Sequence, residues 1–285
     1  MPAMLSLVLL LLMQPRVGEV VRDVEYARID SASLRLDVHL PPGDETRRPA
    51  IVGIHGGGWR GGDKRRIRGL PAFLRAGFVV VSINYRLSPR AHYPAAVNDC
   101  RAAIRWIRRH AADYGIDPDR IGVLGGSAGG HLALMVGMLD EDPEKKTSSR
   151  VQAVCAWFGP ADFRNGPAGD EAFAQFIGAT FEENPDAYRR ASPVTHVSKH
   201  APPTLLIHGE DDRVVPIRHS KTMHAALRAA GADSTLVVVR NAGHGFRGRL
   251  IQPDFRKILS TTVAFFRKKL QGTPRDQPRR VDAQS

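Results

Sequence analysis

A serine among glycines carries the clearest chemical signal in this chain. Residues 125–129 read Gly-Gly-Ser-Ala-Gly, a G-x-S-x-G pattern, between an apolar run that ends at Leu124 and a helical pattern that begins at Ala128. A nucleophile on a tight strand-to-helix turn needs neighbours without bulky side chains. The alternatives are a plain glycine turn or a phosphate loop, and a phosphate loop would need a lysine that this motif lacks. Ser127 is therefore the predicted nucleophile.

A serine hydroxyl attacks effectively only when a base removes its proton. Most of the eleven histidines are unsuitable by position, because they lie on predicted helices, in a long insertion or in strand-ending His-Gly pairs: His131, His219, His224, His196, His200, His55 and His208. His244 follows the last strand-like run and stands between two glycines that permit a tight turn. We predict that His244 is the general base, and the alternative is a loop histidine without a role.

The imidazole needs an acid that holds its tautomer and stabilises the imidazolium formed during reaction. The strand-like run 204–209 is followed by Glu210, Asp211 and Asp212. The spacing G-x-x-D-x-x-V-P, from Gly209 to Pro216, favours Asp212. Glu210 and Asp211 are then expected to be solvated loop charges.

Attack on a carbonyl places negative charge on oxygen, and fixed backbone donors must receive that charge. Residues 55–59 read His-Gly-Gly-Gly-Trp after another apolar run. We predict backbone N–H donors at Gly57, Gly58 and Ala128, while His55 braces the loop by hydrogen bonding. A triple glycine could also form only a turn.

Two aromatic residues flank these motifs. Trp59 ends the glycine-rich stretch, and Phe246 follows the predicted base by two positions. Each is a candidate wall of the substrate pocket, and each could equally be a packed core aromatic.

Five segments taken together resemble the hormone-sensitive-lipase-like α/β-hydrolases: HGGGW (55–59), NYRLSP (84–89), GGSAGGH (125–131), HGEDDRVVP (208–216) and NAGHGF (241–246). HGGGW followed by GDK is most similar to bacterial carboxylesterases related to acetyl xylan and feruloyl esterases. The resemblance covers residues 20–270, and the chain order serine, acid, histidine is that of the α/β-hydrolases.

The resemblance implies Ser127, Asp212 and His244 as the triad, an oxyanion hole at Gly57, Gly58 and Ala128, and no cofactor. One departure concerns the N-terminus. Many lipase-like members carry a longer N-terminal cap, whereas here only residues 19–30 would precede the early strands of a processed protein. A more open acyl pocket is expected.

The elements that must position these residues follow from hydrophobic periodicity. Seven apolar, β-branched runs read as strands covered on both faces. Helical patterns fall between or after them, at residues 63–76, 94–114, 128–139, 217–230 and 253–270. This alternation predicts an α/β-hydrolase fold: a mostly parallel, doubly wound sheet with helices on both faces and a small lid insertion.

The chain divides into four predicted segments. Residues 1–18 are expected to be a signal peptide, because the apolar run 5–13 is too short to span a bilayer. Residues 19–271 form the catalytic domain, with a lid-like insertion at 161–203, and residues 272–285 form a polar, disordered tail. The protein is then secreted or periplasmic. The alternative to a signal peptide is an N-terminal helix that packs on the domain. If the segment is retained in this way, the protein would be cytoplasmic.

Composition limits the partners. The 285 residues are 42% hydrophobic and 25% charged, which excludes a disordered or fibrous chain. The net charge of +12 would permit attraction to nucleic acid, but no nucleic-acid motif accompanies it, so we do not expect nucleic acid as a partner.

Cys100 and Cys155 lack metal-ligand spacing and are predicted to be buried free thiols. No metal, cofactor or membrane span is predicted, and the oligomeric state stays open.

A basic cluster begins beside the glycine-rich stretch, and its members are Arg60, Lys64, Arg65, Arg66 and Arg68. The simpler interpretation is a solvated helix face. The alternative is that these side chains attract anionic groups near the scissile ester.

These predictions converge on a serine carboxylic ester hydrolase that acts through an acyl-Ser127 intermediate. Its substrate would be a small-molecule or carbohydrate ester with a short acyl group, acetylated or feruloylated carbohydrate being one candidate class. An amidase such as an arylformamidase is the near alternative. A non-catalytic binding protein on a hydrolase scaffold is the remote one.

Overall fold

The computed structural model describes residues 18–43, 45–164 and 171–271. Its sheet is built from eight strands: β1 (Val20–Ile29), β2 (Ala32–His39), β3 (Arg48–Ile54), β4 (Val79–Ile83), β5 (Ile116–Gly126), β6 (Ala153–Trp157), β7 (Thr204–Gly209) and β8 (Ser234–Val239). The predicted tail lies outside the described residues, as does the predicted signal peptide except for its last residue, Gly18.

The strands are ordered β1-β2-β4-β3-β5-β6-β7-β8. β1 pairs antiparallel with β2, and β2 pairs antiparallel with β4. From β4 to β8 every neighbouring pair is parallel. This confirms the predicted mostly parallel α/β sheet. β1 was not predicted as a strand, because as an edge strand it is largely exposed and its sequence is broken by charged residues.

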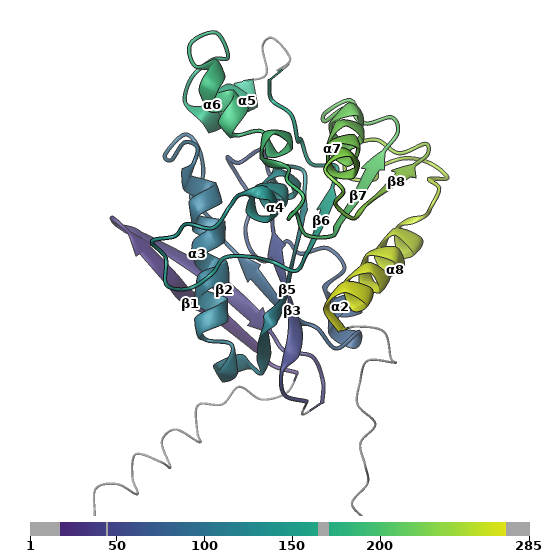
Figure 1. The fold of residues 1–285 in the computed structure, drawn as a ribbon. Coiled ribbons are helices and arrows are strands. Elements are labelled where there is room, and N and C mark those ends of the chain that lie inside the picture. Colours follow the sequence, from purple (N-terminus) through teal and green to yellow (C-terminus); the bar gives the residue numbers. More distant parts are fainter. Residues whose placement is uncertain (1–17, 44, 165–170, 272–285) are drawn as a thin grey trace, which may run out of the picture.

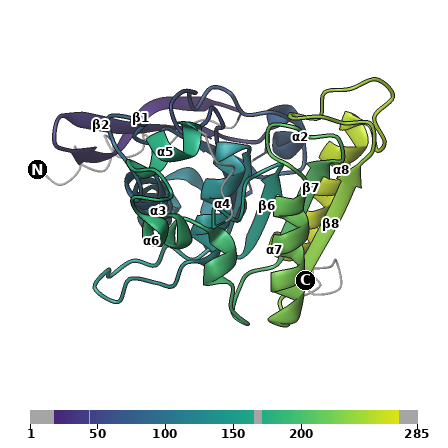
Figure 2. The ribbon, with the colours of Figure 1, turned by 90° about the horizontal axis from the view of Figure 1, so that it is seen from above.

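Helices cover both faces of the sheet (Figures 1 and 2). One face carries α3 (Ala95–Arg109), α4 (Ala128–Met138) and α7 (Arg218–Ala229), and the other carries α2 (Leu70–Arg75) and α8 (Phe255–Phe266). Short elements complete the chain: η1 (Ala112–Tyr114), η2 (Pro193–His196) and η3 (Arg267–Gln271), with α5 (Glu171–Ile177) and α6 (Pro185–Arg190) in the insertion.

The central strands are apolar on both faces because each face has its own core. In β3, Ala50, Val52 and Ile54 pack into the core under α3 and α4, while Ile51 packs into the core under α2 and α8. This period-two alternation explains why these strands are continuous apolar runs. The two cysteines are buried free thiols, Cys100 in the first core and Cys155 in the second, as predicted.

The predicted helix at 63–76 is wrong over its first half. α2 begins only at Leu70, after Gly69, whose φ of 80° is a left-handed conformation that interrupts a helix. The whole basic cluster therefore lies on a loop and not on a solvated helix face. Its member Lys64 is buried, with a side chain 5% exposed.

Lys64 connects this loop to the N-terminal hairpin. Its Nζ lies 2.8 Å from Asp37 Oδ1 in β2 and 2.9 Å from Asp23 Oδ1 in β1. Its backbone N–H donates to Asn84 Oδ1 at 2.7 Å, in the segment after β4. The segment that follows the glycine-rich stretch is thereby attached to β1, to β2 and to the segment after β4.

The insertion at 161–203 packs into the main core in its described part. Phe163, Phe173 and Phe176 are buried in the same apolar cluster as α3 and α4. Figure 1 shows α5 and α6 beyond one end of the sheet, on the side of α3 and α4. The described part of the predicted lid-like insertion is thus held against the domain, because these aromatic side chains need the core to bury them. Across the described residues, no helix is long and apolar enough to cross a membrane.

Replacing the buried lysine tests this attachment. Lys64→Met would remove the nearest cation from the fully buried carboxylate of Asp37 and leave it the exposed Arg22 at 4.0 Å, so we expect the free energy of unfolding to fall by about 3 kcal/mol. Urea denaturation measures the change. The control is Arg65→Gln, which removes an exposed pair with Asp63 and should cost less than about 1 kcal/mol. Equal, small losses in both variants would contradict the role of Lys64.

Candidate active site

Ser127 lies on the turn between β5 and α4. Its φ of 56° and ψ of −125° are unusual for a residue with a side chain, and such strain persists only where the surrounding structure enforces it. The Ser127 N–H donates to the carbonyl of Trp157 at 2.9 Å, which fixes the turn against β6. The hydroxyl is thus presented at the carboxyl edge of the parallel strands, where ligands bind in open α/β sheets.

The glycines around Ser127 are required by close backbone contacts. A Cβ on Gly125 would lie 2.1 Å from the carbonyl oxygen of Gly129. A Cβ on Gly129 would lie 2.2 Å from the carbonyl oxygen of Ile54 in β3. The turn therefore closes only with small residues, which is the steric reason for the G-x-S-x-G pattern.

The three predicted triad residues meet at this edge. His244 Nε2 lies 3.0 Å from Ser127 Oγ, and His244 Nδ1 lies 2.8 Å from Asp212 Oδ2. With Asp212 ionised, Nδ1–H donates to the carboxylate and leaves Nε2 as acceptor for the serine proton. The three residues come from the ends of β5, β7 and β8, which are separated in sequence but share one edge of the sheet.

Asp212, and not Asp211, faces His244. Asp212 is buried, and its Oδ1 accepts the backbone N–H groups of Val214 and Val215, each at 2.9 Å. Burial alone would raise the pKa of this carboxyl, but hydrogen bonds from His208, His244 and the Val215 N–H hold it well below the usual range. Asp212 is therefore a stable anion beside the imidazole.

His208 is a contact of the site that the sequence interpretation set aside. It is fully buried, and its Nε2 lies 3.4 Å from Asp212 Oδ2 and 2.7 Å from the carbonyl oxygen of Val215. Ser220 Oγ donates to its Nδ1 at 2.7 Å, which leaves the proton on Nε2. The sequence signal for His208 was its position at a strand end, four residues before the predicted acid.

The predicted oxyanion donors surround the turn. Gly57 and Gly58 have φ values of 123° and 59°, and their N–H groups donate no hydrogen bond to any described residue. Ala128 is the first residue of α4, where the backbone N–H has no partner within the helix. Three N–H groups are thus free to receive negative charge, and Gly57 lines the same cavity as Ser127.

His55 braces the glycine-rich stretch, in agreement with its expected role. Its Nδ1–H donates to the Gly56 carbonyl at 2.9 Å, and its ring stacks on Tyr85 with centroids 4.3 Å apart. The Tyr85 hydroxyl in turn donates to the His55 carbonyl at 3.0 Å. Burial lowers the pKa of His55, so the ring is neutral and suited to this structural role.

Trp59 is packed in the core. It is 3% exposed, it stacks on Phe176 of the insertion, and its Nε1–H donates to His131 Nδ1 at 3.1 Å. His131 Nε2–H donates to the Ala191 carbonyl at 2.8 Å, and burial lowers its pKa to about 4. Trp59 therefore links the glycine-rich stretch to the insertion.

Phe246 is likewise buried, against Phe158 and Trp157, with ring centroids 4.7 and 5.7 Å away. The cavity beside Ser127 has a volume of about 350 Å³, and its aromatic lining comes from Trp157 and Phe158. Sequence reasoning missed both residues, because they stand in an apolar strand-like run that gives no sign of facing the site.

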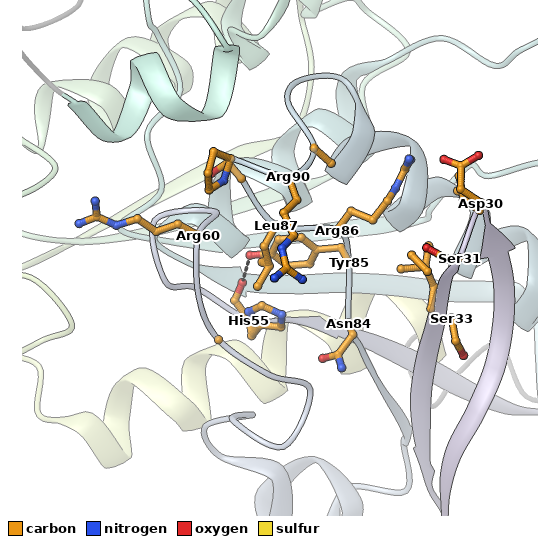
Figure 3. A pocket seen from close by; sticks show the side chains of 17 residues that line it. Asp30, Ser31, Ser33, His55, Arg60, Asn84, Tyr85, Arg86, Leu87 and Arg90 are labelled. Carbon is orange, nitrogen blue, oxygen red and sulfur yellow. Dashed lines mark hydrogen bonds between the residues drawn. The ribbon is translucent and has the colours of Figure 1, made fainter.

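A larger cavity of about 810 Å³ is also lined by His55. Figure 3 shows it between the hairpin that carries Asp30 and Ser33 and the segment that carries Asn84 and Arg86. Ser127 does not line it, so it holds no nucleophile of the triad. The residues that the structure describes contain no cluster of side chains able to hold a metal ion.

The strand order, the strained serine turn and the hydrogen-bonded triad define an α/β-hydrolase with a serine-hydrolase site. The sequence profile of BD-FAE matches residues 36–227, and the chain belongs to this family of α/β-hydrolases.

Known proteins agree with this placement. The chain is 37% identical over 221 residues to Esterase LipQ of Mycobacterium tuberculosis, an alignment that covers 73% of the chain and 52% of LipQ. The chain thus spans about half the length of the curated relatives that it matches. A truncated carbohydrate esterase from gut microbiota has a similar structure, with a TM-score of 0.79, 31% identity, and coverage of 90% of this chain and 99% of that one.

A second solved structure is esterase Est2 of Thermogutta terrifontis with bound propionate. Its TM-score is 0.73 at 31% identity, and the match covers 87% of this chain and 93% of that one.

The nucleophile can be tested by removing one oxygen. Ser127→Ala deletes only the hydroxyl at 3.0 Å from His244, so kcat for an activated ester should fall about 10⁴-fold or more while the melting temperature stays nearly unchanged. A fluorophosphonate probe should label Ser127 in the unmodified protein. Retained turnover, or labelling of Ser82 or Ser88 instead, would contradict the assignment.

The orienting acid has a matched control next to it in the chain. Asp212→Asn keeps the shape but removes the charge that supports the imidazolium, so kcat should fall about 10⁴-fold. The exposed neighbour gives the comparison, because Asp211→Asn should change kcat less than about threefold. A reversed order of the two effects in steady-state kinetics would show that the wrong aspartate was chosen.

Proposed function

We propose that the protein is a serine carboxylic ester hydrolase that cleaves short-acyl esters through an acyl-Ser127 intermediate. The observation that carries this proposal is the continuous hydrogen-bonded series from Asp212 through His244 to Ser127. The relatives named as esterases support the same chemistry. The names therefore favour esters over the amides that an arylformamidase would cleave.

In the first half of the reaction, Ser127 Oγ attacks the ester carbonyl and His244 Nε2 receives the serine proton. The carbonyl oxygen becomes an oxyanion, and the N–H groups of Gly57, Gly58 and Ala128 stabilise it. The C–O bond to the alcohol then breaks, and the imidazolium of His244 protonates the leaving alcohol. The acyl group remains on Ser127.

In the second half, His244 removes a proton from water, which attacks the acyl carbonyl. A second oxyanion forms, its collapse releases the acid, and Ser127 regains its proton from His244. Asp212 stays ionised throughout and stabilises each imidazolium through its bond with Nδ1–H. Its depressed pKa is suited to this role, because a protonated Asp212 could not offset the positive charge.

The size of the cavity supports a short acyl group. At about 350 Å³ it lies near the lower end of the roughly 300–1,000 Å³ typical of small-molecule sites. The structurally similar Est2 is known with propionate and with butyrate bound. We further propose acetylated or feruloylated carbohydrate as a substrate class, supported by the similarity to a carbohydrate esterase from gut microbiota.

A series of 4-nitrophenyl esters from acetate to decanoate tests the acyl size. Each buried methylene contributes only about 0.8 kcal/mol, so gains in kcat/KM should end where the cavity ends. We expect a maximum between acetate and butyrate and a clear fall by octanoate. Acetylated xylan and methyl ferulate, measured alongside, would test the carbohydrate class. A kcat/KM that rises through decanoate would contradict the short-acyl proposal.

A further inference from the structure

Three arginines line the cavity that contains Ser127. Arg66 and Arg68 come from the loop before α2, and Arg247 comes from the loop that carries His244. No aspartate or glutamate is among the described residues that line this cavity. Its ionisable lining other than His55 is therefore purely cationic, whereas the larger cavity that His55 also lines contains Asp30 as well as arginines.

These guanidinium groups are not neutralised by the protein around them. None of the three forms an ion pair with a described residue, although the adjacent Arg65 pairs with Asp63 at 2.7 Å. Arg66 and Arg247 are exposed. Arg68 donates from Nη1 to the Gly245 carbonyl at 2.9 Å and lies over the Phe255 ring at 4.4 Å. Arg68 is thus fixed beside the His244 loop, with its other N–H groups available.

Holding like charges together is unfavourable unless an anion joins them. Partial burial lowers the pKa of Arg68, and the nearby charge of Arg247 lowers it further. A guanidinium group pairs with a carboxylate through two parallel hydrogen bonds, and such charge-assisted bonds are stronger than neutral ones. A carboxylate in the cavity would therefore relieve the repulsion and gain these bonds.

We propose that the Ser127 cavity selects esters that also carry a carboxylate, which Arg66, Arg68 and Arg247 bind while the ester lies at the oxyanion donors. This inference rests on the proposed esterase function and specifies its substrate class. The carboxylate can belong to the acyl group or to the leaving alcohol, since the arginines border a cavity that opens directly onto Ser127.

Two pairs of nearly isosteric esters separate charge from shape. On the alcohol side, 3-acetoxybenzoate is compared with 3-acetoxybenzamide, and on the acyl side, monobenzyl succinate is compared with benzyl succinamate. We expect kcat/KM in at least one pair to be about tenfold or more higher for the carboxylate. The pair that shows the preference identifies the side that carries the charge. Raising salt from about 20 to about 500 mM should reduce the preference.

Arginine variants assign the preference to the cavity. The double variant Arg66→Gln/Arg247→Gln should bring the carboxylate-to-amide ratio of kcat/KM close to one. Arg68 is left intact because its bond to Gly245 also supports the His244 loop. The control is Arg249→Gln, an equal charge change at an exposed residue outside the cavity lining, which should keep the ratio. A ratio near one in both pairs for the unmodified protein would overturn the inference.

A binding measurement on a variant without the nucleophile tests the anion site independently of ester hydrolysis. Titration calorimetry on Ser127→Ala compares the affinities for the carboxylate and carboxamide member of each pair. Tighter binding of a carboxylate that the arginine double variant loses supports the anion site, and equal affinities contradict it. If the unmodified protein hydrolyses neither pair nor any 4-nitrophenyl ester, the proposed esterase function fails, and the calorimetry alone decides the anion site.

Discussion

The turn at Ser127 brings backbone segments of β3, β5 and α4 closer together than a side chain would allow. A Cβ on Gly129 would approach the Ile54 carbonyl to 2.2 Å, and one on Gly125 would approach the Gly129 carbonyl to 2.1 Å. This contact places the nucleophile next to the glycine-rich stretch that continues β3. The positive φ of Ser127 is the local cost, and the parallel sheet packed on both faces holds it in place.

Two anchors hold the glycine-rich stretch in place. At one end, Trp59 packs against Phe176 of the insertion and donates to the buried His131 of α4. At the other, the buried side chain of Lys64 forms ion pairs with Asp23 and Asp37 of the N-terminal hairpin. Such preorganisation matters because oxyanion donors are effective only when they need no rearrangement during reaction. None of the described residues of the insertion or the hairpin lines the cavity beside Ser127, and both support the site through these anchors.

The site has one buried negative charge and a set of exposed positive charges. Asp212 is buried and ionised, held by backbone N–H groups, His208 and His244, and it directs negative charge at the imidazole. Arg66 and Arg247 stand at the exposed border of the cavity, where no described carboxylate pairs with them. An anion bound deep in the site would compete with Asp212 for the imidazolium of His244. An anion at the border of the cavity would contact only the arginines.

The sequence by itself determined the features that depend on local patterns: the parallel sheet from two-faced apolar runs, and Ser127, Asp212 and His244 from motifs at strand ends. These motifs are readable because turn geometry restricts which residues can follow a strand. Only the tertiary structure decided that Trp59 and Phe246 are packed and that Lys64 is buried. The same holds for His208 beside Asp212 and for the placement of Arg66 and Arg247 around one cavity. Such contacts join segments far apart in the chain, and their partners leave no signature in local spacing.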